Sequence, residues 1–93
     1  MDKKMPNVSI ITTNWNRCQY IERVWRSIES QTHRNIEWIV CDDGSSDGTG
    51  DLAREAGAHI IRHDTNRGYD QTLNSGFFYA DKSDYEYVVT MDA

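Results

Sequence analysis

Acidic and aromatic side chains follow the apolar runs of this sequence, where a parallel sheet would bring them together. Trp15 follows one β-branched run, Asp42 and Asp43 follow a second, and Asp92 follows a third. An indole ring can stack on a nucleobase, and a carboxylate can accept a hydrogen bond from a base N–H or bind a divalent cation. These residue types predict a site for a nucleoside diphosphate.

Strand and helix patterns alternate along the whole chain, which indicates an α/β fold with a parallel sheet. We expect strands at residues 8–12, 36–41, 58–62 and 85–91, and helices at residues 18–30, 49–56 and 69–80. The first helix has an apolar stripe at i, i+3, i+4 and i+7, formed by Ile21, Val24, Trp25 and Ile28. Asn16 is expected to cap this helix.

The order of the strands decides whether their polar ends meet. An order of 3-2-1-4 makes the first strand the neighbour of the second and the fourth, and open parallel sheets bind ligands where the strand order reverses. We therefore expect a three-layer α/β/α, Rossmann-like fold with a mostly parallel sheet in this order. The side chains expected to converge on the resulting crevice are Thr13, Trp15, Asn16, Asp42, Asp43 and Asp92.

Composition and charge exclude several other classes of protein. The 93 residues are 38% hydrophobic and 27% charged, as in an ordinary globular domain, and they are too few for two independent cores. The formal net charge of -5 argues against a nucleic-acid-binding surface, which is normally basic. No apolar run approaches the ~20 residues of a membrane span, and the isolated Cys18 and Cys41 are expected to be buried free thiols.

Four motifs in register resemble those of family 2 glycosyltransferases. They are VSIITTNWNR at residues 8–17, IVCDDGSSDGT at residues 39–49, Asn66-Arg67-Gly68 with Asn74-Ser75-Gly76, and Met91-Asp92-Ala93. The last motif resembles the D-x-D of the family, interrupted after its middle residue, so we expect a chain that is cut there. Two positions depart from the family pattern, because Thr13 replaces a common Pro and Leu73 replaces an Arg.

The resemblance implies a GT-A fold in which residues 1–93 form the donor-binding part and the acceptor-binding half is absent. It implies metal-dependent transfer of a sugar, with inversion, from a nucleotide-sugar, foremost a UDP-sugar, to a hydroxyl of a glycan or lipid. Thr13 and Trp15 would flank the base of the donor, which Asp42 would contact. Asp92 would bind Mg²⁺ or Mn²⁺ beside the diphosphate. The donor-binding residues that the resemblance implies are Thr13, Trp15, Asn16, Asp42, Asp43, Gly68, Asn74 and Asp92.

The resemblance also sets expectations for the chain as a whole. The general base of the family lies downstream of the D-x-D motif, so we expect this chain to bind nucleotide without transferring sugar. The full-length protein is expected in the cytoplasm or at the cytoplasmic face of the membrane. Self-association is expected through the uncovered edge of the last strand.

Other functions and a structural interpretation compete with this one. Asp42-Asp43-Gly44 is also a common polar turn after a strand, and loop shaping or helix capping is expected for Asp43 and Asp47. A dinucleotide-dependent oxidoreductase would need a G-x-G-x-x-G turn, whereas residues 14–17 hold no glycine. A phosphoacceptor domain would carry its acidic pair after the first strand. A non-catalytic nucleotide-binding α/β domain stays open as an alternative.

Glycines and histidines of the second half of the chain have simple structural interpretations. Gly68, Asn74 and Gly76 are expected to shape a loop and to let a helix pack closely on the sheet. His59 and His63 are four residues apart in the third strand region and share one face. A polar edge strand explains the two histidines better than a metal pair does.

Overall fold

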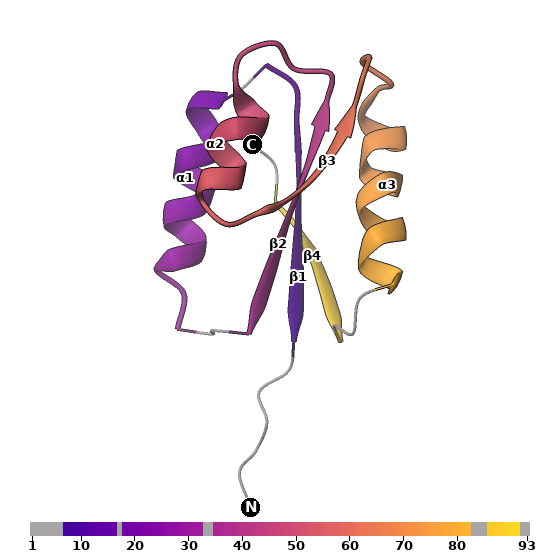
Figure 1. Ribbon diagram of the computed structural model, residues 1–93. Coiled ribbons are helices and arrows are strands. Elements are labelled where there is room, and N and C mark those ends of the chain that lie inside the picture. Colours follow the sequence, from indigo (N-terminus) through magenta and orange to yellow (C-terminus); the bar gives the residue numbers. More distant parts are fainter. Residues whose placement is uncertain (1–6, 17, 33–34, 83–85, 92–93) are drawn as a thin grey trace, which may run out of the picture.

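The computed structural model describes residues 7–16, 18–32, 35–82 and 86–91. Strands and helices alternate in the order β1 (Val8–Asn14), α1 (Cys18–Glu29), β2 (Ile36–Asp43), α2 (Thr49–Glu55), β3 (His59–His63), α3 (Tyr69–Lys82) and β4 (Tyr87–Thr90). The sheet has the order β3-β2-β1-β4 with parallel pairing throughout. Helices α1 and α2 cover one face of the sheet and α3 covers the other (Figure 1). The predicted three-layer α/β/α fold and the strand order 3-2-1-4 are confirmed.

Side chains of β2 alternate between two separate cores. Trp38 and Val40 belong to the cluster under α1 and α2, whereas Ile39 and Cys41 belong to the cluster under α3. The buried indole of Trp38 donates a hydrogen bond to the hydroxyl of Thr12 on β1 (3.0 Å), so its one polar atom has a partner. The period of two along the strand therefore assigns each residue of β2 to one layer of the fold.

β1 and β2 extend further than the hydrophobic pattern predicted, whereas β4 covers Tyr87–Thr90 rather than residues 85–91. β1 runs to Asn14 rather than residue 12, and β2 runs to Asp43 rather than residue 41. β3 covers residues 59–63 rather than 58–62, so His63 is a strand residue and not the first residue of a loop. The hydrophobic pattern stops early because the ladder is made by backbone N–H and C=O groups, which polar residues also carry. Pairing of Asn14 with Asp42 continues the ladder to the polar ends.

The start of α1 differs from the prediction. Asn16 does not cap this helix; it adopts a positive φ of 52°, and its Oδ1 accepts a hydrogen bond from the backbone N–H of Ser46 (2.8 Å). The N–H of Cys18 instead donates to Oδ2 of Asp47 (2.9 Å), and the N–H of Thr49 donates to Oδ1 of the same carboxylate (3.2 Å). Asp47 thus accepts the N–H of the first residue of both α1 and α2, although the N-cap position of α2 is Gly48, which forms no side-chain capping bond.

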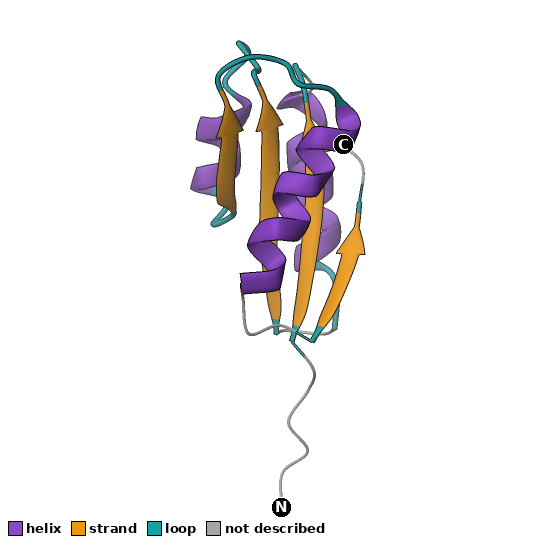
Figure 2. Cartoon of the chain, turned by 90° about the vertical axis from the view of Figure 1, so that its right-hand side faces the viewer, coloured by secondary structure: helices purple, strands orange, loops and turns teal. Residues whose placement is uncertain are grey.

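Helix α3 packs closely across the sheet (Figure 2). A methyl group at Gly76 would lie 2.5 Å from Cγ2 of Ile11 and 3.0 Å from Sγ of Cys41, so only glycine fits there. This confirms the packing role predicted for Gly76. Cys41 is buried as predicted, and burial raises the pKa of its thiol to about 12. The prediction that Cys18 is buried as well is wrong, because this first residue of α1 is only half-buried.

The helices that the structure describes are too short or too polar to cross a bilayer.

Candidate functional site

The carboxyl ends of β1 and β2 lie side by side and form one edge of the candidate site. Thr13 pairs with Cys41 and Asn14 pairs with Asp42, so the polar ends of the two strands meet as predicted. Trp15, the first residue after β1, exposes 52% of its surface, which confirms its predicted exposure. An exposed indole beside polar strand ends can stack on a planar ligand.

The turns that follow β1 and β2 are hydrogen-bonded to each other. The backbone N–H of Asn16 donates to Oγ of Ser45 (2.8 Å), and Oδ1 of Asn16 accepts from the backbone N–H of Ser46 (2.8 Å). Asn14, which the sequence analysis did not single out, bonds through its Oδ1 to the hydroxyl of Thr49 at the start of α2 (3.0 Å). These bonds fix the peptide that carries Trp15 against the end of β2.

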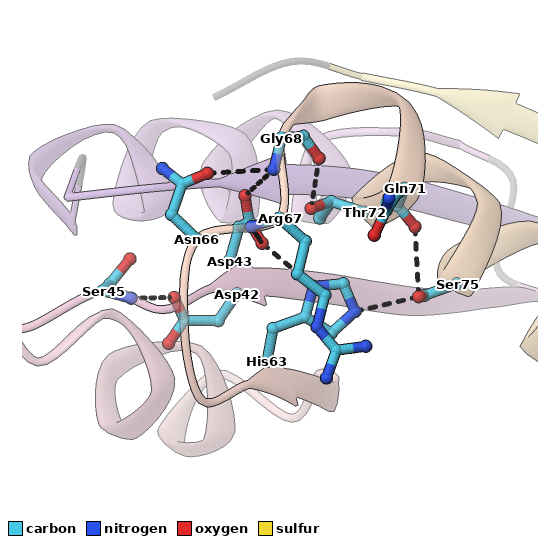
Figure 3. Close-up of polar contacts among 10 residues, drawn as sticks. All are labelled: Asp42, Asp43, Ser45, His63, Asn66, Arg67, Gly68, Gln71, Thr72 and Ser75. Carbon is cyan, nitrogen blue, oxygen red and sulfur yellow. Dashed lines mark hydrogen bonds and ion pairs between the residues drawn. The ribbon is translucent and has the colours of Figure 1, made fainter.

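Asp42 lies on the face of β2 that α2 covers, since a methyl group at Gly50 would lie 3.7 Å from its Oδ2. The residue is fully buried, and its Oδ1 accepts a hydrogen bond from the backbone N–H of Ser45 (2.9 Å; Figure 3). Its Oδ2 is buried too, with no hydrogen-bond partner among the residues that the structure describes. Buried carboxylate oxygens normally have a donor, so this free acceptor distinguishes Asp42 from the other acids of the site.

Asp43 points to the opposite face, and both of its oxygens are occupied. Oδ1 accepts from the backbone N–H of Arg67 (2.8 Å) and lies 2.9 Å from Nδ1 of His63, while Oδ2 accepts from the N–H of Gly68 (2.9 Å; Figure 3). Burial raises the pKa of this carboxyl, but hydrogen bonds from the Arg67 backbone, His63, Thr72 and the Gly68 backbone together outweigh it, so the pKa is lowered from 3.8. Asp43 is therefore a carboxylate that organises the loop between β3 and α3, as predicted.

The loop of residues 64–68 packs directly on the turn that follows β2. Gly44 has a φ of +82°, and a methyl group there would lie 2.8 Å from the backbone N of Asn66 and from the carbonyl carbon of Thr65. Gly68 has a φ of +89°, and its N–H also donates to Oδ1 of Asn66 (2.9 Å). The loop-shaping role predicted for Gly68 is confirmed, and Gly44 is a second glycine that the contact between the two loops requires.

The position of His63 is the feature of this region that sequence reasoning most clearly missed. The predicted strand ends at residue 62, whereas His63 is the last residue of β3, pairs with Asp43 in the register and is only 7% exposed. Its Nε2 lies 2.9 Å from Oγ of Ser75 on α3. His59, on the same face of β3, is exposed and stacks on Tyr79 at 4.0 Å between ring centroids. The spacing of the two histidines was the signal that could have placed His63 under α3.

The family of this chain follows from a match to the model of glycosyl transferase family 2 over residues 9–93. The match takes in both strand ends described above. The chain belongs to glycosyl transferase family 2. The resemblance carried by the four motifs is thereby confirmed.

Known relatives of this family 2 chain are longer than it is. The GalNAc(5)-diNAcBac-PP-undecaprenol beta-1,3-glucosyltransferase of Campylobacter jejuni is 31% identical over 94 residues, which is 95% of this chain and 29% of the relative. The chain spans 23%, 27% and 36% of the length of three further curated relatives.

Solved glycosyltransferases share the fold of this family 2 chain. The mannosyltransferase PcManGT of Pyrobaculum calidifontis, solved with GDP-Man and Mn²⁺, has a TM-score of 0.83 at 24% identity, over 96% of this chain and 28% of that one. Glucosyl-3-phosphoglycerate synthase of Mycobacterium tuberculosis, solved with Mn²⁺, UDP and glucosyl-3-phosphoglycerate, has a TM-score of 0.74 at 25% identity, over 94% of this chain and 33% of that one. These likenesses identify the fold of the family 2 chain as GT-A.

The structure brings together six of the eight predicted donor-binding residues, while one lies elsewhere and one lies outside the described residues. Thr13, Trp15, Asn16, Asp42 and Asp43 lie at the adjoining ends of β1 and β2, and Gly68 reaches this region through its bond to Asp43. Asn74 lies exposed further along α3. Asp92 lies outside the described residues, although the N–H of Met91 still donates to the carbonyl of Ile11 (2.9 Å), beside β1.

Proposed function

We propose that this chain is the donor-binding part of a glycosyltransferase that transfers a sugar from a nucleotide-sugar to an acceptor hydroxyl with inversion. Membership of glycosyl transferase family 2 supports the reaction class. The observation that carries the role of this chain is the free, buried Oδ2 of Asp42, one strand away from the exposed ring of Trp15. A carboxylate acceptor beside an aromatic surface suits a nucleobase that offers an N–H.

In this proposal Trp15 stacks on the base, Thr13 and Asn16 shape the wall beside it, and Asp42 accepts the base N–H. Because Oδ2 of Asp42 is closed to solvent, the base reaches it only when the turn bearing Trp15 or the turn at Ser45 moves aside. A shift of side chains and a loop on binding is common in proteins, and the Asn16–Ser45 bonds are the ones that must yield. Asp43 and Gly68 support the donor site by holding the loop of residues 64–68. Asn74 lies beyond this loop, on α3.

The proposed cofactor is Mg²⁺ or Mn²⁺, held by Asp92 and the diphosphate of the donor. Such a cation neutralises the charge that develops on the departing nucleoside diphosphate. Among the described residues no three His, Cys, Asp or Glu side chains form a ready-made metal site. This donor set fits a cation that takes one or two carboxylates and completes its shell with phosphate oxygens and water. The presence of Mn²⁺ in the two solved relatives supports the proposal.

The proposed donor is a UDP-sugar and the proposed acceptor is a glycan or a lipid-linked glycan. The UDP complex of one solved relative supports uracil as the base of the donor. The other relative was solved with GDP-Man, so the identity of the base has to be tested. The name of the Campylobacter relative supports a polyprenol-linked acceptor. For the full-length protein we propose action in the cytoplasm at the membrane surface, where it would meet such an acceptor.

Isothermal titration with UDP, GDP and ADP in the presence of MnCl₂ tests the proposal. We expect UDP to bind and Asp42→Asn to weaken binding roughly 10- to 100-fold, since a hydrogen bond to a charged group is worth about 1.5–3 kcal/mol. Asp51→Asn is the matched control, because Asp51 is an exposed carboxylate on α2. Equal affinity in both variants, or no nucleotide binding by the unaltered chain, would contradict the proposal.

We further propose that these 93 residues bind the donor without transferring its sugar. The two acids at the end of β2 are not placed to deprotonate an acceptor, since Asp42 is buried and both oxygens of Asp43 accept hydrogen bonds. Release of UDP from UDP-glucose with a glycan acceptor, measured by coupled assay, would overturn this statement.

A further inference from the structure

The last two residues of β3 hold the turn after β2 from opposite faces of the sheet. Arg62 lies beside Asp42 in the register and donates from Nη2 to the carbonyl of Ser45 (3.2 Å). His63 lies beside Asp43 and bonds through Nδ1 to its carboxylate (2.9 Å). Because successive strand residues face opposite ways, one residue secures each side of the turn.

The imidazole of His63 is itself fixed on both sides. Asp43, whose pKa is lowered, is an acceptor only, so Nδ1 of His63 carries the proton of that bond. Nε2 lies 2.9 Å from Oγ of Ser75, and that hydroxyl lies 3.1 Å from the carbonyl of Gln71 on α3 (Figure 3). The ring therefore joins β2, β3 and α3 through hydrogen bonds, buried on the side of Asp43 and only part-buried on the side of Ser75.

The chain of contacts leads from His63 to the loop over the candidate site. Asp43 receives the N–H groups of Arg67 and Gly68, which are consecutive donors of that loop. The same loop lies against Gly44, the residue that follows the acidic pair. A change in the orientation of the Asp43 carboxylate must therefore move either the loop or the turn that carries Asp42.

We propose that His63 is a positioning residue that orients Asp43 and so holds the loop of residues 64–68 against the turn that carries Asp42. The part of this inference that concerns nucleotide affinity rests on the proposed function. A buried polar residue with no such role would stabilise the fold as a whole and would not affect this loop in particular. The inference therefore predicts a local effect, and local exchange of backbone N–H groups measures it without any ligand.

The experiment compares His63→Leu, His63→Asn and His59→Leu by hydrogen exchange detected with NMR. His63→Leu removes both ring nitrogens, whereas the amide of His63→Asn keeps a donor near the position of Nδ1. His59→Leu is the matched control, because His59 lies on the same face of β3 but stacks on Tyr79 outside the Asp43 network. The N–H of Val40, in the buried centre of β2, reports global unfolding.

We expect His63→Leu to increase exchange at Arg67 and Gly68 at least tenfold more than at Val40, and His63→Asn to restore most of the protection. The His59→Leu variant should change all three N–H groups equally. If His63→Leu does not fold, Ser75→Ala, which removes only the partner of Nε2, should give the same pattern at smaller amplitude. Equal changes at the three N–H groups in the His63 and Ser75 variants would overturn the inference.

Titration with UDP and MnCl₂ tests the second part. We expect His63→Leu to weaken UDP binding about tenfold and His63→Asn to recover it. Unchanged affinity in His63→Leu, while Asp42→Asn still weakens binding, would overturn the link between the loop and the site. If the unaltered chain binds no nucleotide, the proposed function fails, and the exchange pattern still decides whether His63 positions the loop.

Discussion

Replacement of Gly44 by alanine tests the contact between the two loops that surround Asp42 and Asp43. Gly44 has a φ of +82°, and the new Cβ would lie 2.8 Å from two backbone atoms of residues 65 and 66, well inside the 3.4–4 Å of ordinary contact. Those atoms belong to a loop whose N–H groups are bound to Asp43, so they cannot turn aside as a side chain would. We expect Gly44→Ala to destabilise the domain and to displace the loop.

The magnitude has two contributions. A left-handed conformation costs a residue with a Cβ about 1–2 kcal/mol. Overpacking against atoms that must move costs about a further 1–3 kcal/mol. The total of roughly 2–5 kcal/mol is a large share of the ~5–15 kcal/mol by which a domain of this size is stable.

Gly48→Ala is the matched control. Gly48 has a φ of +83°, nearly that of Gly44, but a methyl group there would meet no atom within 4 Å. Its cost should therefore be the conformational contribution alone, and the effect of alanine on the unfolded chain cancels between the two variants. The difference between them isolates the contact of the loops.

Urea unfolding followed by tryptophan fluorescence measures this difference, because Trp38 is buried in the core. With a urea dependence of about 1–2 kcal/mol/M for a domain of this size, the midpoint of Gly44→Ala should lie roughly 1–2 M below that of Gly48→Ala. Equal midpoints for the two variants would refute the reasoning, because they would mean that the loop of residues 64–68 does not bear on Gly44.

Three further predictions follow from the acidic pair and the last strand. Folding lowers the pKa of Asp43, so the stabilisation that its carboxylate provides is complete above the ordinary value of 3.8 and is lost as the pH falls below it. In urea unfolding across that pH range, Asp43→Asn should therefore lose less stability than the unaltered chain. Asp42→Asn should leave the urea midpoint nearly unchanged, and a loss as large as that of Asp43→Asn would show that Oδ2 has a partner after all. The chain should self-associate through β4, whose residues are exposed and uncharged. In sedimentation velocity, Val89→Lys should reduce this association and Gln71→Lys should not. A monomer at every concentration would rule the prediction out.

The sequence was sufficient for the architecture because patterning of period two and 3.6 reports burial, and burial determines the layers. The alternation of Trp38 and Val40 with Ile39 and Cys41 fixes which helix covers which face, and the strand order then brings the polar ends together. Motifs at four places in register identified the family. The hydrophobic patterns and the motifs are local in the chain, and the arrangement of the strands follows from the right-handed connection between parallel strands.

The details of the site depend on contacts between distant residues, which no local pattern contains. Asn16 looked like a helix cap because it precedes α1, but its amide bonds to Ser46, thirty positions away in the sequence. The predicted third strand ends at residue 62 because polarity marks strand ends, yet the register places His63 beside Asp43 under α3. A side chain bonds with whichever donor the fold brings nearest, and sequence distance does not limit that choice.

The two adjacent carboxylates therefore differ in their contacts, because their side chains face opposite sides of the sheet. Asp43 faces α3, where two backbone N–H groups and a histidine use both of its oxygens, so it cannot serve a ligand without releasing the loop. Asp42 faces α2, where one oxygen holds the turn through Ser45 and the other keeps its capacity to accept. A buried, unsatisfied acceptor is unfavourable for folding, and proteins retain such groups where a bound ligand satisfies them. The pair thus combines Asp43, whose two oxygens are both bonded, with Asp42, whose free Oδ2 accepts the base of the donor in the proposed function.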